Sequence, residues 1–399
     1  MVSVLARRFG YLHLETIEDA VQDALIAAMK KWPFTGTPQN SRAWLIETAK
    51  NRVIDQLRRS GKSETISDTF CYDGDFETHL SGEVDEDELR MIFVCCDPAI
   101  PPDMQVALTL KTVGGFSVGE IARAFLSNNE AVAKMLTRAK AKFRESIDAI
   151  EIPSRYELRR RSNAVIKVLY LMFSEGYAAS EGDELVRKDL CYEAIRLAAL
   201  LSRHPFTRSP KIHSLLALCL FQAARLETRI DQNGELLLLE DQDRSSWNKA
   251  MLSEGLKHFR LSASGDELTD YHLEAEIAAV HAFSPDFAST DWERILQCYD
   301  DLQKRNFSPI VELNRVVALE KLHGVGAAQS ALDDLGADAL PRPDLFHITR
   351  AHLFGLRGEH ADAIAEIETA ITFATNQPIR RFLQLKIEKL RACHCPTLT

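Results

Sequence analysis

The chain has 399 residues, of which 46% are hydrophobic and 27% charged, and its formal net charge is −10. This composition is that of a globular protein long enough for two or three domains, and it excludes a collagen-like or wholly disordered chain. The sequence has no run of about 18 apolar residues, so no membrane span is expected. Eight scattered cysteines favour a reducing cytosol over a secreted, disulfide-bonded framework, and we expect a cytoplasmic protein.

Charge is distributed unevenly along the chain. Residues 1–62 hold ten Lys and Arg against six Asp and Glu, whereas residues 63–88 hold ten acids and no Lys or Arg. Residues 103–145 are basic again, with seven cations to four acids. Because the acidic stretch has little hydrophobic pattern, it predicts a linker between two basic modules.

The first basic module begins with a predicted amphipathic helix. Thr16 is a candidate cap for this helix, and Pro33 and Pro38 should interrupt it. Its apolar positions recur at helical spacing, at Ile17, Val21, Ala24, Leu25, Ala28 and Met29. Its other face carries Glu18, Asp19, Gln22 and Asp23. We expect the first set to be buried and the second to face solvent.

A second helix follows, with Ser41 as its candidate cap. Its predicted buried stripe consists of Ile46, Ala49, Val53 and Leu57. The other side carries Trp44, Asn51, Asp55 and Arg58. Cations gather toward its end, at Arg52, Arg58, Arg59 and Lys62. An aromatic ring beside so many cations predicts a polyanion-binding face, and the alternative is an ordinary solvated basic surface.

The second basic module predicts three helical pieces. Pro102 starts the first piece, and the Gly114-Gly115 pair ends it. Ser117 caps the next, with Glu120 at the capping-box position. A polar turn at 127–129 then leads into a basic helix that Glu130 opens. A helix, a short turn and a basic helix are the helix-turn-helix pattern.

The chain from about residue 152 onward is patterned almost entirely as helices. Within its last hundred residues, similar side chains recur at intervals of 33 to 35 residues, in the sets Tyr299, Leu332 and Ile367, Arg315 and Arg350, and Gly324 and Gly358. A period of about 34 with paired helices is the tetratricopeptide signature. Helical repeats are therefore predicted, most clearly over residues 290–390.

These features, in this order, resemble the extracytoplasmic-function sigma factors of bacterial RNA polymerase. Their region 2 helix that binds the polymerase clamp resembles EDAVQDALIAAMKKW, and their segment that melts and reads the −10 promoter element resembles AWLIETAKNRVIDQLRR. Their region 4, which reads the −35 element, resembles GGFSVGEIARAFLSNNEAVAKMLTRAKAKFRE. The remainder is similar to the subfamily with a C-terminal tetratricopeptide-like extension, on YLMFSEGYAAS and LLLLEDQDRSSWNKAM.

The resemblance implies an all-α protein in four parts. These are region 2 at 1–62, the acidic linker at 63–88, the region 4 helix-turn-helix at 89–150 and the helical extension at 151–399. The implied function is that of a sigma factor, which binds core RNA polymerase and promoter DNA and directs promoter recognition, melting and transcription initiation. No catalysis, cofactor, metal or membrane partner is expected.

The resemblance also assigns roles to single residues. Polymerase binding is implied for Asp19, Gln22 and Asp23. Binding at the −10 element is implied for Trp44, Asn51, Arg52, Asp55, Arg58, Arg59 and Lys62. Binding at the −35 element is implied for Lys134, Arg138, Lys140 and Arg144. Trp44 either stacks on an unpaired base or packs beneath its helix as core, and the cations hold phosphates.

Two departures from the family pattern stand out. The first region 2 helix is expected to be short, because the sequence begins at residues that usually lie midway through it. Met135 stands where the subfamily usually has Arg, so one −35 contact is expected to be altered.

The C-terminal repeats are expected to regulate the reading modules. Acids such as Glu240, Asp241 and Asp243 could dock on regions 2 and 4 within the same molecule. A rival hypothesis is a DNA-binding repeat scaffold or transcription regulator that acts without binding core polymerase. No metal site is expected at 393–395, where Cys-His-Cys has no second ligand pair nearby, and Cys95 and Cys96 are expected to pack in the interior.

Overall fold

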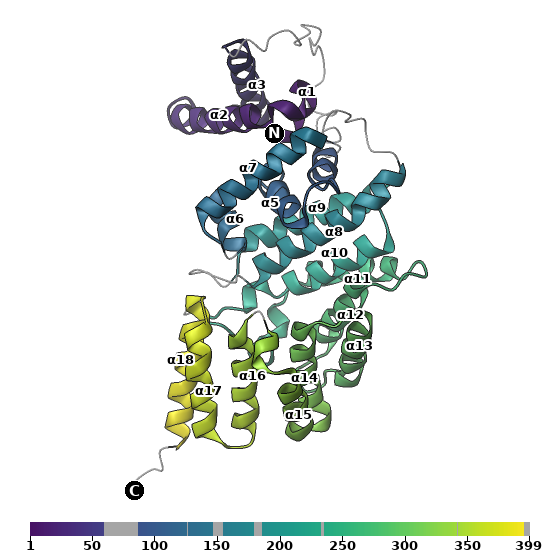
Figure 1. Ribbon diagram of the computed structural model, residues 1–399, viewed down its shortest axis with the longest axis vertical. Helices are drawn as coiled ribbons and strands as arrows, with labels where there is room; N and C mark the ends of the chain where they lie inside the picture. The colour runs from purple at the N-terminus through teal and green to yellow at the C-terminus, as the bar shows by residue number, and fades with distance from the viewer. Residues whose placement is uncertain are drawn as a thin grey trace. The chain divides into compact units, whose positions relative to one another are not determined.

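The computed structural model describes residues 1–59, 87–125, 127–146, 155–178, 186–232, 235–340 and 342–394 (Figure 1). Within these ranges the regular elements are helices, apart from isolated bridges such as that between Ile230 and Leu236. The predicted all-α class is therefore confirmed. The chain divides into two compact units, Met1–Val168 and Leu169–Thr399.

The first unit is built from short and medium helices. In chain order they are α1 (Val2–Phe9), η1 (Tyr11–His13), α2 (Leu14–Thr35), α3 (Ser41–Arg59), a helical stretch at 87–95, α5 (Pro102–Thr112), α6 (Val118–Ala124), α7 (Asn129–Ser146) and the first part of α8 (Arg155–Tyr177). Residues 60–86, which include Lys62 and nearly all of the predicted linker, lie outside the described part of the chain.

Helix α2 buries a narrower apolar stripe than the sequence predicts. The expected Ile17, Val21, Ala24 and Ala28 are buried. Leu25 and Met29, however, are exposed by 44% and 77%, and Glu18 of the expected polar face is buried. Successive residues turn by about 100°, so Leu25 and Met29 point past the edge of the stripe. Glu18 is covered because Lys140 of α7 reaches it.

The ends of α2 also differ from the prediction. The helix begins at Leu14, so Thr16 lies inside it rather than capping it. It continues through Pro33 and ends at Thr35, where Gly36 adopts a φ of +79°. Pro33 has no amide hydrogen to donate to the Met29 carbonyl and its ring crowds that carbonyl, so it weakens the last turn of α2, which ends two residues later.

Helix α3 has the predicted buried stripe. Its buried residues are Ile46, Ala49, Val53 and Leu57. The cap lies one residue earlier than predicted, because the Ala43 amide donates to Oδ1 of Asn40 at 2.8 Å, which makes Asn40 rather than Ser41 the capping residue.

Both basic modules contribute to one hydrophobic core in the first unit. The cluster combines Leu5, Ile17, Ile46 and Val53 with Met91, Val94, Leu108 and Phe143. Burying a side chain of this size stabilises the fold by about 1.5–3 kcal/mol. The modules are therefore held together by a shared interior.

Helices α6 and α7 are capped as their sequence predicts. The Ser117 amide donates to Oε2 of Glu120 at 2.7 Å, and the Glu120 amide donates to Oγ of Ser117 at 3.2 Å. This reciprocal pair confirms the capping box. Asn128 caps α7 by accepting from the Ala131 amide at 2.8 Å, so α7 begins at Asn129, one residue before the predicted Glu130.

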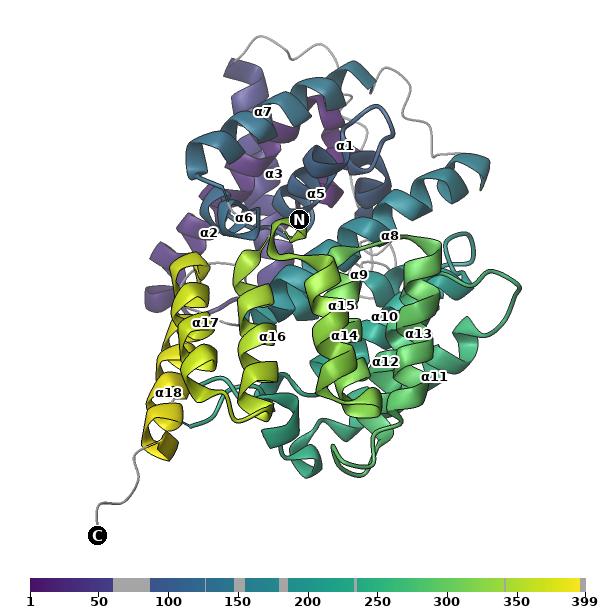
Figure 2. The same cartoon turned by 60° about the horizontal axis from the view of Figure 1, so that its bottom comes forward.

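The second unit continues as helices that follow one another in space. They are α9 (Lys188–Arg203), α10 (Pro210–Ala223), α11 (Lys249–Ser262), α12 (Asp270–Phe283), α13 (Trp292–Arg305), α14 (Pro309–His323), α15 (Val325–Leu335), α16 (Pro343–Leu356), α17 (His360–Phe373) and α18 (Gln377–His394). Helix α10 contacts α9, α11 and α12 and is buried on nearly all sides. Helices α13 to α18 lie side by side in chain order (Figure 1, Figure 2).

The period read from the sequence has a structural counterpart. Tyr299, Leu332 and Ile367 lie on α13, α15 and α17, which alternate with the helices that carry Arg315 and Arg350. Gly324 lies between α14 and α15, and Gly358 lies between α16 and α17, with φ of +81° and +77°. Each glycine thus separates one pair of helices from the next. The assignment of these pairs to the tetratricopeptide class stays a prediction.

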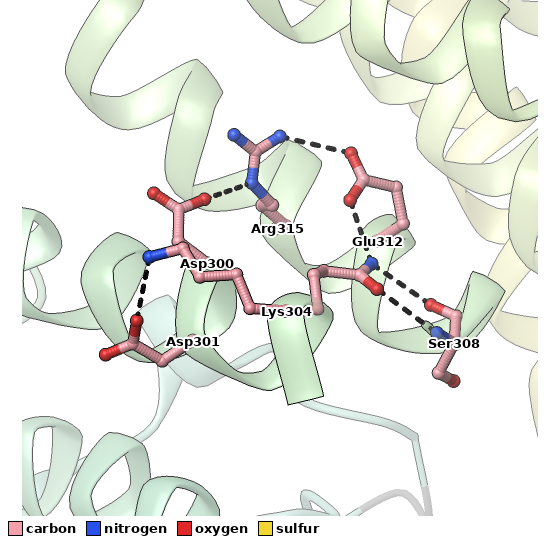
Figure 3. A network of polar contacts seen from close by, with 7 residues as sticks. Asp300, Asp301, Lys304, Ser308, Glu312 and Arg315 are labelled. Carbon is pink, nitrogen blue, oxygen red and sulfur yellow. Dashed lines mark hydrogen bonds and ion pairs between the residues drawn. The ribbon is translucent and has the colours of Figure 1, made fainter. Parts of the chain in front are cut away.

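The two repeated arginines join neighbouring helices through ion pairs. Arg315 of α14 donates to Asp300 of α13 at 2.6 Å and to Glu312 at 3.1 Å, as Figure 3 shows. Arg350 of α16 donates to Glu366 of α17 at 2.6 Å. Each arginine thus joins its helix to a neighbouring helix through an ion pair. Arg315 pairs with the helix that precedes its own, and Arg350 pairs with the helix that follows its own.

Candidate nucleic-acid interface

The exposed face of α3 carries most of the side chains predicted to meet the −10 element. Asn51, Asp55, Arg58 and Arg59 are exposed, opposite the buried stripe of the same helix. Arg58 and Arg59 stand in its last turn, where the cationic guanidinium groups also interact favourably with the helix dipole. This end of α3 is therefore a cationic surface beside two polar side chains that can form hydrogen bonds to bases.

Trp44 is only half-buried, which leaves both of its predicted roles open. Its ring meets that of Trp32 edge to face, with centroids 5.5 Å apart. The ammonium of Lys31 lies 5.8 Å from its centroid. Trp32 was not singled out from the sequence, because it directly precedes Pro33, where a helix end was expected. The pair forms an aromatic step between α2 and α3.

Two residues assigned to different partners are joined to each other. Arg52 of α3 donates to Oδ2 of Asp23 on α2 at 2.9 Å, with both side chains more than two-fifths exposed. The sequence placed Arg52 on DNA and Asp23 on polymerase. An exposed ion pair contributes about 0–1 kcal/mol, so either partner can leave it at little cost.

The predicted polymerase-binding face of α2 extends further than the sequence indicated. Asp19 and Gln22 are exposed, and the same stripe continues into Ile26 and Met29, which are 48% and 77% exposed. The spacing of three or four residues aligns all four along one side of the helix. Large apolar side chains gathered on an exposed stripe are typical of protein-binding surfaces.

Helix α7 divides its four predicted DNA-binding cations into two groups. Lys134 and Arg138 are exposed, and Lys134 pairs with Glu130 of its own helix, at 2.6 Å. Lys140 instead binds Glu18 of α2 at 2.6 Å, with side chains 14% and 10% exposed. The fourth cation pairs in a more open setting, as Arg144 binds Glu15 at 2.7 Å.

The two pairings with α2 are long-range contacts, because Lys140 and Glu18 are 122 residues apart in the sequence. No local pattern predicts such a partner. In this arrangement Lys140 is held in an enclosed pair, whereas Lys134 and Arg144 are in exposed pairs and Arg138 is itself exposed.

Replacing Lys140 with Ala is expected to destabilise the first unit by about 2 kcal/mol. The substitution leaves the carboxylate of Glu18 enclosed without its cation, and Oε1 of Glu18 already has no hydrogen-bond partner among the described residues. Urea unfolding of the full chain measures the loss. Arg144→Ala is the matched control, because its pair is exposed and should contribute no more than about 1 kcal/mol. Equal losses in the two variants would contradict the assignment.

Cys95 and Cys96, the two cysteines described in the first unit, are interior, as predicted. Cys95 and Cys96 are fully buried, and Sγ of Cys95 lies 3.2 Å from Oγ1 of Thr112. Burial raises the pKa of the Cys95 thiol to about 12, so the thiol stays protonated and unreactive.

Within the described ranges, no group of three His, Cys, Asp or Glu side chains is placed to hold a metal ion. The side chains of residues 393–395, where no metal site is expected, lie outside the described part of the chain. Among the described helices, none has the length and apolar character needed to cross a bilayer.

Comparison with known families agrees with the two-unit organisation. Residues 1–63 match the model of sigma-70 region 2, the segment that contains α1, α2 and α3. Residues 161–263 match a family of unknown function, DUF6596. No solved structure matches. The N-terminal module is thus a sigma-70 region 2, the domain type of transcription initiation factors.

One relative extends over nearly the whole chain. An uncharacterized protein of Rhizobium meliloti (strain 1021), R00370, is 38% identical over 389 residues, which is 96% of this chain and 92% of the relative. The chain belongs to the family of this protein.

Proposed function

We propose that the chain is a sigma factor of the extracytoplasmic-function type. It binds core RNA polymerase, recognises a promoter at two elements and helps to open it. The observation that carries this proposal is the sigma-70 region 2 match over residues 1–63, because this segment contains both the exposed stripe of α2 and the cationic end of α3.

Promoter opening requires no covalent chemistry from the protein. It requires a surface that binds the separated strand better than the duplex binds itself. Stacking of a base on an aromatic ring contributes about 1–3 kcal/mol, and flipping a base costs a few. The Trp32–Trp44 step supplies the aromatic surface, and Arg58 and Arg59 supply phosphate contacts beside it.

Polymerase binding is assigned to the stripe of α2 that begins at Asp19 and Gln22. Ile26 and Met29, which continue this stripe, are exposed apolar side chains that would be buried against the polymerase. The acids make the stripe complementary in charge to a basic partner. Region 4 contact with the −35 element is assigned to α7, first through its exposed Lys134 and Arg138.

Reconstituted transcription tests the proposal, and the variant Arg58→Ala/Arg59→Ala sharpens the test. Promoter affinity of the holoenzyme should fall, and the slope of log affinity against log salt should flatten by up to about two units, because each lost phosphate contact removes roughly 0.9. Binding to core polymerase should be unchanged. Arg42→Ala removes an exposed cation from the other end of α3 and is the matched control. Binding to duplex DNA without binding to core polymerase would instead support the rival hypothesis of a DNA-binding repeat scaffold.

The second unit is proposed to regulate the first by docking on regions 2 and 4 within the same molecule. The structure guides where to separate them, since Arg161 of α8 binds Asp97 of the first unit at 2.8 Å. A chain that ends after Val168, where the first unit ends, keeps this contact. Its promoter-dependent transcription should differ clearly from that of the full chain. Equal transcription, together with no binding between separated units, would rule out this regulatory role.

A further inference from the structure

A cavity of about 320 Å³ lies in the second unit, among helices far apart in the sequence. Its walls come from α12, α13, α14, α16 and α18 and from the segment that precedes α11. The apolar walls include Leu238, Trp292, Tyr299, Val317, Ile348 and Phe382. A chamber of this size and composition is typical of sites for small organic molecules. We call it the apolar chamber.

Cationic side chains also line the apolar chamber. Lys321 is paired with Glu320 at 3.0 Å. Lys386 has no carboxylate within ion-pairing distance among the described residues, and burial lowers its pKa, opposed by the charge of Glu240, which also lines the apolar chamber.

A second, smaller cavity adjoins the first. It has a volume of about 120 Å³ and shares His281 and Tyr299 with the apolar chamber. Its other polar walls are Gln222, Arg225 and Trp247, and none of its lining residues is an Asp or Glu. We call it the polar chamber.

Three nitrogen atoms of residues that line the polar chamber are enclosed and have no hydrogen-bond partner among the described residues. They are Nε of Arg225, Nε1 of Trp247 and Nδ1 of His281. Trp247 is 3% exposed, so bulk water does not reach its indole N–H freely. Each unsatisfied buried donor costs about 1–3 kcal/mol, and native proteins rarely leave several of them together.

The electrostatic setting of the polar chamber is positive. Burial, with Arg225 and Arg244 nearby, lowers the pKa of His281 to about 4, so its imidazole is neutral at pH 7. Arg244 is held in place by donating to the backbone carbonyls of His281 and Ser284. None of the residues that line the chamber is acidic and several carry N–H donors, which favours a carboxylate, although the nearby charge of Asp286 offsets part of that of Arg244.

Ordered water alone explains only part of this arrangement. A cavity of 120 Å³ holds about four waters at roughly 30 Å³ each, and these could satisfy the three nitrogens. Water molecules would form few hydrogen bonds in the apolar chamber, because its walls are largely Leu, Ile, Val and aromatic rings. A molecule with one anionic end and one apolar end matches the lining of the two chambers, which share His281 and Tyr299.

We propose that the second unit binds a small organic acid with an apolar or aromatic body. The carboxylate lies in the polar chamber and accepts hydrogen bonds from Arg225 and Trp247. The apolar body fills the larger chamber between Trp292 and Phe382. This site goes beyond the proposed sigma function, because it gives the second unit a ligand of its own, and it stands whether or not the chain binds polymerase.

Calorimetric titration of the full chain tests the proposal with three acids as probes: 1-naphthaleneacetate, indole-3-acetate and decanoate. At least one is expected to bind with a dissociation constant below about 1 mM, and the uncharged amide of that acid should bind at least tenfold more weakly, the ratio expected from one lost charge-assisted hydrogen bond. Absence of binding by all three acids, or equal binding of acid and amide, would overturn the proposal.

Two variants locate the bound acid. Arg225→Met removes the guanidinium and keeps an unbranched apolar stem, and Trp247→Phe removes the indole N–H while keeping a ring. Each should weaken the acid at least fivefold and leave the amide nearly unchanged. Lys249→Met, on the exposed start of α11, is the charge-matched control and should bind as the parent does. Unchanged acid affinity in both chamber variants would show that the polar chamber holds only water.

Discussion

Replacing Gly176 with Ala is expected to destabilise the second unit by about 3 kcal/mol, at the upper end of the usual range for overpacking. A Cβ at this position of α8 would lie 2.7 Å from Cβ of Leu190, 2.8 Å from the Cys191 nitrogen and 2.9 Å from the Arg187 carbonyl oxygen. Two of these atoms are backbone, so rotating a side chain cannot relieve the overlap. The start of α9 would have to move away from α8, and the bond from the Arg187 amide to the Gly176 carbonyl, now 2.7 Å, would be lost.

Urea unfolding followed by circular dichroism measures this effect. Gly326→Ala is the matched control, because Gly326 lies in α15 and a Cβ there meets no atom within 4 Å. That substitution should be neutral or stabilise by up to about 1 kcal/mol, since it restricts the unfolded chain. If Gly176→Ala unfolds at the same urea concentration as Gly326→Ala, α8 and α9 do not approach as closely as described.

Local periodicity predicted the helices of the first unit well where one face is covered by a neighbour. The stripe of α3 was predicted completely, because all four of its apolar positions face the core. The stripe of α2 was predicted only in part, since hydrophobicity alone does not say where the covering helix stops. Leu25 and Met29 look like core residues in the sequence and are exposed side chains in the fold.

Long-range pairing explains why the site prediction was incomplete. Lys140 and Arg144 carry the same charge and spacing as Lys134 and Arg138, so the sequence treats all four alike. The structure separates them only because Glu18 and Glu15 of α2 come to lie beside the first two. Which cations are free is therefore a property of tertiary packing and has no local signature.

The segment LLLLEDQDRSSWNKAM shows the same distinction. It was picked out by resemblance, and the only role attached to its residues was the docking of Glu240, Asp241 and Asp243 on regions 2 and 4. In the fold, Leu238 from this segment lines the apolar chamber and Trp247 lines the polar one. Arg225, His281 and Tyr299 join them from other elements, and nothing in the sequence marks those five residues as neighbours.

Buried acid in the second unit gives a prediction about pH. Glu274 of α12 accepts a hydrogen bond from the Tyr170 hydroxyl at 3.3 Å. Burial raises the pKa of Glu274 from 4.5 to about 7, against the opposing effect of the Tyr170 bond. The folded protein therefore binds this proton more tightly than the unfolded chain does. The stabilisation is fully present below pH 4.5 and is lost as the pH rises toward 7.

Glu274→Gln should remove this dependence, because the amide has the same shape and does not ionise. At pH 8 the variant is expected to be more stable than the parent by up to about 3 kcal/mol, the equivalent of the shift at about 1.4 kcal/mol per unit. At pH 4.5 the two should nearly coincide. Tyr170→Phe removes the hydrogen bond that favours the carboxylate and should raise the pKa of Glu274 further. The stability should then be lost over a higher range of pH. Urea unfolding at intervals from pH 4.5 to 8 gives the difference between each variant and the parent, which isolates this carboxyl from every other group that titrates. Parallel curves for the parent and Glu274→Gln would mean that the carboxyl is already solvated in the folded protein.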